Sequence, residues 1–89
     1  MPKIILTAHL INHAGGSEFS VAGATVREAL NALFTERPLL RSYLLDDQGA
    51  LRHHVVAFVN GEVVHNKQTL DDPVPPDGEV YLLQALSGG

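Results

Sequence analysis

The sequence contains no cysteine among its 89 residues. This absence excludes disulfide bonds, a thiolate nucleophile, a thioester formed on this chain and sulfur-ligated metal sites. Any thiol chemistry in which the protein takes part must therefore belong to a partner.

Long apolar runs are also missing. No run approaches the ~18 residues of a membrane span, and Thr7 and His9 interrupt the apolar start of the chain, where a signal peptide would have a continuous core. We therefore expect a cytoplasmic protein. A hydrophobic content of 45% with 18% charged residues is typical of a folded domain rather than a disordered one.

Basic residues are scarce, and the net charge is -4. A nucleic-acid-binding protein would need a basic patch, so this charge argues against that function. Residues 1–41 have four basic against three acidic residues, a net charge of +1, whereas residues 42–89 have two against seven, a net charge of -5. The acidic half could steer the chain toward a basic partner surface, or it could simply keep a small protein in solution.

The start of the chain predicts a β-hairpin. Residues 3–11 are rich in β-branched and apolar types, and residues 18–21 alternate polar and apolar side chains, as a half-buried strand does. Between them, residues 12–16 have the composition of a turn.

A helix should follow this hairpin. Thr25 and Glu28 have the spacing of a capping box, which places the helix start at Thr25. Pro38 disfavours helical geometry at the residue before it, so the helix should end near Arg37. Apolar residues recur between these limits at helical spacing, at Val26, Ala29, Leu30 and Leu33. Residues 39–45 could add a short second helical piece.

The second half of the chain predicts three more strands. Residues 54–59 form the first, and Asn60-Gly61 is a strong hairpin signal because a type I′ turn needs positive φ at both positions. Residues 62–65 then pair back as a short strand. The proline-containing segment 66–78 is an irregular connection to the last strand, residues 79–86.

This order of elements predicts an α+β fold of the β-grasp type: a mixed sheet of four to five strands with one main helix packed across one face. The last strand should lie in the centre, beside the first, because both of its alternating sets of side chains are apolar. One long helix covers only one face, so part of the other apolar face should be exposed. We expect residues 1–86 to form a single domain and residues 87–89 to be a flexible reactive tail.

The chain ends in Gly88-Gly89. A terminal glycine has no Cβ and offers an unhindered carboxylate that can be threaded into a narrow enzyme channel. That carboxylate is ionised at pH 7 and can attack the α-phosphate of ATP. A frayed terminus or an expression artefact would have the same sequence, so the dipeptide needs support from the fold.

Other candidate sites are weaker. The five histidines, His9, His13, His53, His54 and His65, have no cysteine partner and no helical i, i+4 spacing, so we expect no metal site. The Asp46-Asp47 and Asp71-Asp72 pairs are better explained as solvated loop residues than as acid/base pairs, since turn carboxylates lack desolvation. No serine has an elbow motif around it, and Gly15-Gly16 has no following lysine to make a phosphate-binding loop.

At this point the sequence resembles the ubiquitin-like sulfur carriers, a family that includes the small subunit of molybdopterin synthase, the thiamin sulfur carrier and a carrier of cysteine biosynthesis. The resemblance covers nearly the whole chain, and its middle section is more similar to the cysteine-biosynthesis and archaeal modifier branch. It rests on four segments taken together: Thr25 to Leu30, Leu51 to Gly61, Asp77 to Val80 and Ala85 to Gly89.

The resemblance implies a carrier rather than an enzyme. Gly89 would be adenylated by a ubiquitin-activating-type enzyme and converted to a thiocarboxylate that donates sulfur to a biosynthetic acceptor, while Ser87 and Gly88 thread the tail into the partner. ATP and magnesium would be used by that partner, with no cofactor bound here, and the free carrier would be a monomer. In several relatives a metalloprotease removes residues after the diglycine, so this chain either needs no maturation or is already trimmed.

The resemblance also implies a docking function for the uncovered sheet face. By strand parity this face should include Phe58, Val63, Tyr81 and Leu83, and we add Leu86 to the predicted partner-docking set. Any one of these side chains could instead complete a small core.

Two alternatives use the same tail. In the first, the chain is a protein modifier whose Gly89 forms an isopeptide bond with a lysine; only Lys3 and Lys67 could then link copies of this chain. In the second, it is a non-catalytic subunit of a molybdopterin-synthase-like complex. The pathway that receives the sulfur is not encoded in these residues.

Overall fold

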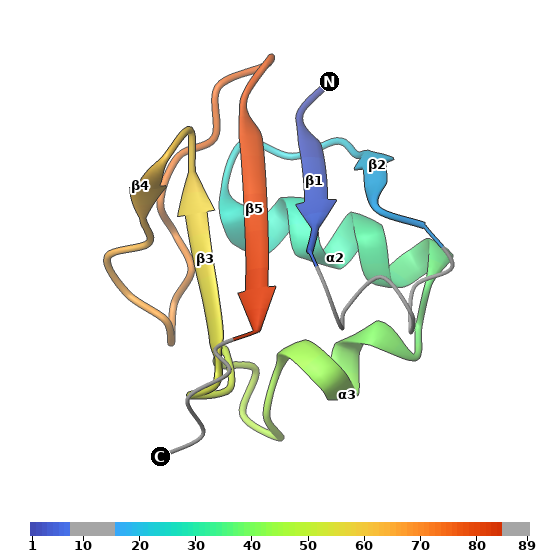
Figure 1. Ribbon diagram of the computed structural model, residues 1–89, viewed down its shortest axis with the longest axis vertical. Helices are drawn as coiled ribbons and strands as arrows, with labels where there is room; N and C mark the ends of the chain where they lie inside the picture. Colours follow the sequence, from blue (N-terminus) through green and yellow to red (C-terminus); the bar gives the residue numbers. More distant parts are fainter. Residues whose placement is uncertain (8–15, 85–89) are drawn as a thin grey trace.

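The computed structural model describes residues 1–7 and 16–84. Its five strands form one mixed sheet in the order β2-β1-β5-β3-β4 (Figure 1). The strands are β1 (Lys3–Leu6), β2 (Glu18–Ser20), β3 (Val55–Val59), β4 (Glu62–Val63) and β5 (Glu79–Gln84). The β1–β5 pair is parallel and the other pairs are antiparallel.

The last strand is the centre of the sheet, as its two apolar faces predicted. β5 pairs with β1 from Lys3↔Glu79 to Leu6↔Leu82 and with β3 from Val59↔Val80 to Val55↔Gln84. The hairpin β1–β2 and the short hairpin β3–β4 therefore lie on opposite sides of one strand. This sheet order, with a main helix across one face, confirms the β-grasp arrangement.

Helix α2 (Val26–Glu36) covers one face of the sheet (Figure 1). Its predicted apolar stripe is buried, together with Phe34, which lies one turn after Leu30. The stripe packs against the inward-facing strand residues, which include Ile4, Val55, Val80 and Leu82. Burying each large aliphatic side chain of this kind contributes about 1.5–3 kcal/mol.

The capping box at the start of α2 is present with one difference. The Thr25 hydroxyl accepts a hydrogen bond from the Glu28 N–H at 3.2 Å, as predicted. The Glu28 carboxylate, however, accepts from the N–H of Ala24 at 2.9 Å rather than from that of Thr25. At its other end, α2 closes at Arg37, whose N–H bonds to the Leu33 carbonyl.

The long connection between β4 and β5 holds the start of α2. The first two helical N–H groups, of Val26 and Arg27, donate to the carbonyls of Asp72 and Leu70 at 3.1 and 2.8 Å. These N–H groups have no partner inside a helix, so the loop carbonyls satisfy them. Leu70 has a positive φ of 55°, an uncommon backbone for a leucine that places its side chain in the core.

Several boundaries differ from the predicted ones. β1 ends at Leu6, whereas the prediction ran to residue 11; residues 8–15 lie outside the described part of the chain. β4 ends at Val63, and β3 begins at Val55 because the two preceding histidines form a turn. The short second helix is present as α3 (Leu40–Leu44), with Leu40 and Leu44 buried. No helix in the described ranges is long and apolar enough to cross a membrane.

Candidate functional site

β5, the strand that precedes the diglycine, is hydrogen-bonded along its length. Beyond the paired residues of β1, both the backbone N–H and the hydroxyl of Thr7 donate to the Leu82 carbonyl, each at 3.3 Å. On the other side, the ladder with β3 continues to Val55↔Gln84. β5 is therefore held on both sides up to its last residues.

The start of β5 is fixed by the hairpin turn between β3 and β4. Asn60 and Gly61 have φ values of 48° and 88°, the positive values that a type I′ turn requires. The N–H of Asn60 donates to the Glu79 carbonyl, and the Asn60 side-chain oxygen accepts from the Glu79 N–H, each at 2.9 Å. The asparagine of the hairpin signal thus also anchors the central strand.

The predicted reactive residues follow directly on this strand. Ser87, Gly88 and Gly89 come three to five residues after Gln84, and with Leu86 they lie outside the described residues. The structure describes the strand that precedes these residues, β5, which is the central strand and has a neighbour on each side.

The other predicted docking residues gather on the face opposite α2. Phe58 is in register with Tyr81 on one side and Val63 on the other, while Leu83 is in register with Val56. Phe58, Tyr81 and Leu83 are half-buried, and Val63 is 55% exposed. Below we call the set Ile5, Val56, Phe58, Val63, Tyr81 and Leu83 the open face.

Two members of the open face, Ile5 and Val56, were not predicted from the sequence. Ile5 is in register with Tyr81, and Val56 with Leu83. Strand alternation could have identified both, because Ile4 and Val55, their neighbours in sequence, face the core. Exposed apolar side chains also occur on α3 and just before it, where Tyr43 is 44% and Leu39 is 76% exposed. α3 lies at the same end of the molecule as the C-terminal end of β5 (Figure 1).

The histidines that the structure describes do not form a ligand set. His53 and His54 lie in a turn and contact each other edge to face, with ring centroids 5.6 Å apart, whereas the predicted strand included His54. His9 and His13 lie outside the described residues. Among residues 1–7 and 16–84, no three His, Cys, Asp or Glu side chains are placed to hold a metal ion.

One aspartate of each pair accepts backbone hydrogen bonds in its loop, in addition to being solvated. The backbone N–H groups of Ala50 and Gln48 bind the Asp46 carboxylate and lower its pKa. The pKa of Asp72 is lowered chiefly by the backbone N–H of His65, which lies 3.1 Å from the carboxylate. The His65 ring also lowers it, with Nδ1 2.8 Å from the same carboxylate. Lowered pKa values keep these groups ionised, which is unsuited to a general acid near neutral pH.

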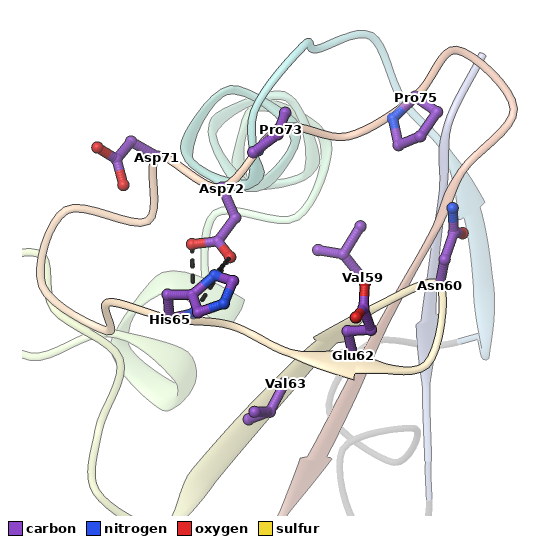
Figure 2. A pocket seen from close by; sticks show the side chains of 9 residues that line it. All are labelled: Val59, Asn60, Glu62, Val63, His65, Asp71, Asp72, Pro73 and Pro75. Carbon is purple, nitrogen blue, oxygen red and sulfur yellow. Dashed lines mark hydrogen bonds and ion pairs between the residues drawn. The ribbon is translucent and has the colours of Figure 1, made fainter.

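A hollow of about 410 Å³ lies beside β4 (Figure 2). The His65–Asp72 pair lines it together with Glu62, Pro73 and Pro75. None of the described residues that line it is a serine, threonine, cysteine or lysine, so the pair has no side-chain nucleophile to activate. No sequence pattern indicates this hollow, because its walls come from two segments, 59–65 and 71–75, that only the fold brings together.

Comparison with known proteins identifies the family. The family model described as the ThiS family matches residues 4–89. A search of curated protein sequences returned no significant match.

The solved structures most useful for comparison share the full length of the chain. SAMP1 from Haloferax volcanii is 33% identical, covers 99% of this chain and 98% of its own, and superposes with a TM-score of 0.81. CysO from Mycobacterium tuberculosis is 24% identical over 97% and 100% of the two chains, with a TM-score of 0.84. The structure of the Amycolatopsis orientalis BexX/CysO complex contains a chain 22% identical over 100% of both, with a TM-score of 0.86. The last two likenesses concern the fold alone, whereas the family match and the SAMP1 identity extend to sequence. The chain belongs to the ThiS family of ubiquitin-like sulfur carriers.

Proposed function

We propose that the protein carries sulfur on its last residue, Gly89. A partner enzyme adenylates the Gly89 carboxylate, AMP leaves, and a sulfide or persulfide takes its place to give a thiocarboxylate. In this proposal the adenylating enzyme, and not the carrier, holds the ATP and magnesium. The thiocarboxylate then donates its sulfur to a biosynthetic enzyme.

One observation supports this proposal above the others: the diglycine follows the central strand of the sheet. β5 is hydrogen-bonded to β1 and β3 and is fixed at its start by Asn60. A strand anchored in this way can aim the short segment that follows it, whereas a segment leaving a frayed edge strand would have no fixed direction. Ser87 and Gly88 would then enter the partner's channel as a thin, unhindered chain.

The open face is the proposed docking surface for the adenylating enzyme. Phe58, Tyr81 and Leu83 are only half-buried although they are large and apolar, and Val63 continues their row at the sheet edge. Contiguous exposed apolar side chains are typical of protein interfaces. We include Leu86 in this surface, so that docking would extend from the sheet toward the tail.

A mass measurement tests the proposal. The protein is incubated with the adenylating enzyme of the same organism, ATP, magnesium and a sulfur donor, and its intact mass is recorded. We expect replacement of one oxygen by sulfur at Gly89. The matched variant Gly88→Val keeps the carboxylate but adds a β-branched side chain to the tail, so it should fold normally and remain unmodified. An unchanged wild-type mass, with a control carrier converted, would contradict the proposal.

A second use of the same tail is favoured by the similarity to SAMP1. One solved structure 30% identical to this chain is described as a small archaeal modifier protein 1. On this basis the activated Gly89 would also form isopeptide bonds with lysines. Immunoblotting for conjugates of higher mass separates this use from sulfur transfer, because conjugation requires no sulfur donor.

A further inference from the structure

The two lysines of the chain differ in what their amino groups do. Lys67 follows β4 in the long connection, and its Nζ donates to the carbonyl of Arg52 at 3.1 Å and to that of His53 at 3.5 Å. Its backbone carbonyl also accepts from the Leu51 N–H at 2.9 Å. Lys67 therefore joins the connection to the segment before β3, and its half-buried amine must leave these carbonyls before it can react.

Lys3 has no such structural task. Its contact is an ion pair with Glu18 on the neighbouring strand, at 3.2 Å, in which the two side chains are 48% and 55% exposed. Exposed ion pairs of this kind are weak and exchange readily with water. The alternation of β1, with Ile4 and Leu6 in the core, places Lys3 on the same side of the sheet as the open face.

The parallel pairing of β1 and β5 places Lys3 far from the tail of its own chain. Lys3 is in register with Glu79, the first residue of β5, and β5 runs away from it for five residues, about 17 Å. Residues 85–89 reach at most about 17 Å when fully extended. Only the reach of the Lys3 side chain would remain for the chain to reverse direction, so acylation of Lys3 by Gly89 of the same copy is strongly disfavoured. The start of β1 and the C-terminal end of β5 lie at opposite ends of the sheet (Figure 1).

We propose that Lys3 is the site at which a second copy of this chain is attached through its activated Gly89. The inference rests on the proposed function for its activated tail. The neutral Lys3 amine attacks the acyl carbon of the Gly89 adenylate, and a C–N bond forms. The C–O bond to the phosphate breaks, AMP departs with the electron pair, and the amine proton goes to solvent. The product is an isopeptide bond, and the joined copies are arranged head to tail.

This assignment can be tested without the adenylating enzyme. A donor chain, in which both lysines are replaced by arginine, is prepared as a Gly89 thioester of a small thiol. The acceptors are ¹⁵N-labelled full-length chains: wild type, Lys3→Arg and Lys67→Arg. Dimers are quantified by intact mass, and the acylated residue is located by peptide mass. Free lysine amide as acceptor shows that the thioester is reactive, and circular dichroism shows that each acceptor is folded.

We expect the dimer to form at Lys3. Lys3→Arg should lower the dimer yield about tenfold, because the remaining lysine, Lys67, must first break a charge-assisted hydrogen bond before it can react. Breaking one such bond corresponds to a factor of about ten. Lys67→Arg should leave the yield within about twofold, because arginine can still donate to the same carbonyls. Acylation mainly at Lys67 or at the Met1 amine overturns the assignment, as does a dimer yield unaffected by Lys3→Arg. The absence of a dimer while lysine amide is acylated also overturns it.

The design separates this inference from the proposed function. The thioester replaces the adenylate, so a failure of adenylation in the mass experiment leaves the Lys3 result unaffected. Conversely, thiocarboxylate formation without any Lys3 dimer would support sulfur transfer and refute the Lys3 assignment alone.

Discussion

Two neighbouring leucines of β5 provide a strong test of how the central strand divides its two faces. Leu82 faces α2 and is fully buried, whereas Leu83 lies on the open face and is half-buried. We infer that Leu82 stabilises the fold and that Leu83 contacts the adenylating enzyme. The variants Leu82→Ala and Leu83→Asp should therefore affect different measurements.

The expected magnitudes follow from burial. Truncating a fully buried leucine to alanine typically costs about 3 kcal/mol, which includes the cavity left behind. A domain of this size has a total stability of roughly 5–13 kcal/mol, so Leu82→Ala should lower Tm by about 12–24 °C. Leu83→Asp loses a cross-strand apolar contact with Val56, but its carboxylate can face water. We expect a cost of about 1 kcal/mol, or about 4–8 °C.

Thermal unfolding is followed by far-ultraviolet circular dichroism, since the chain contains no tryptophan. Adenylation is followed as ATP–pyrophosphate exchange with the adenylating enzyme, at a temperature where both variants are folded. Leu82→Ala should retain exchange, and Leu83→Asp should lose it. Unfolding of Leu83→Asp as severe as that of Leu82→Ala would show that Leu83 belongs to the core. A folded Leu83→Asp with full exchange would show that the open face does not dock the enzyme.

Two further predictions concern the start of α2 and the loop that holds it. Thr25→Ala removes the hydroxyl that accepts from the Glu28 N–H and should lower the free energy of unfolding by about 1 kcal/mol. The control is Thr35→Ala, because the Thr35 hydroxyl only donates to a carbonyl of the same helix; this variant should change stability by less than about 0.5 kcal/mol. Equal losses of stability in the two variants would exclude the cap. The pKa of Asp72 in the folded protein lies below its ordinary value of 3.8. The ionised Asp72 carboxylate therefore stabilises the fold above pH 3.8, and this stabilisation is lost as the pH falls through the folded pKa. Tm should therefore fall more steeply in acid for the wild type than for Asp72→Asn, and identical acid limbs would refute a role for the His65 contact.

Most of the fold could be predicted from local patterns. The Thr25 cap and the apolar stripe of α2 depend on residues within a few positions of one another, and the Asn60-Gly61 turn depends on two adjacent residues. Such signals need no tertiary information, because hydrogen bonds and φ preferences act over short sequence distances. The central position of β5 was also predictable, since a strand at a solvated edge would alternate apolar and polar side chains, whereas β5 has apolar side chains on both faces.

The strand ends were less predictable, for a physical reason. Residues 54 and 64–65 have suitable composition for a strand, but specific contacts end the strands before them. His54 lies in a turn that the hydrogen bond from the Val55 N–H to the Arg52 carbonyl closes. The Val64 N–H still donates to the Ala57 carbonyl, but the N–H of His65 donates to the Asp72 carboxylate in the long connection instead of to β3. Such boundaries are decided by particular contacts rather than by local propensity.

The candidate site divides in the same way. The sequence by itself determined the unhindered Gly88-Gly89 end, the absence of any cysteine and the presence of only two lysines, because these are properties of residue type. The tertiary structure decided which side chains form the open face, that Asp72 binds His65 across the loop, and that the amine of Lys67 is engaged while that of Lys3 lies in a weak, exposed ion pair. These differences depend on the register of β1, β3 and β5 and on contacts between residues distant in the chain, and only the folded backbone brings such residues within hydrogen-bonding distance.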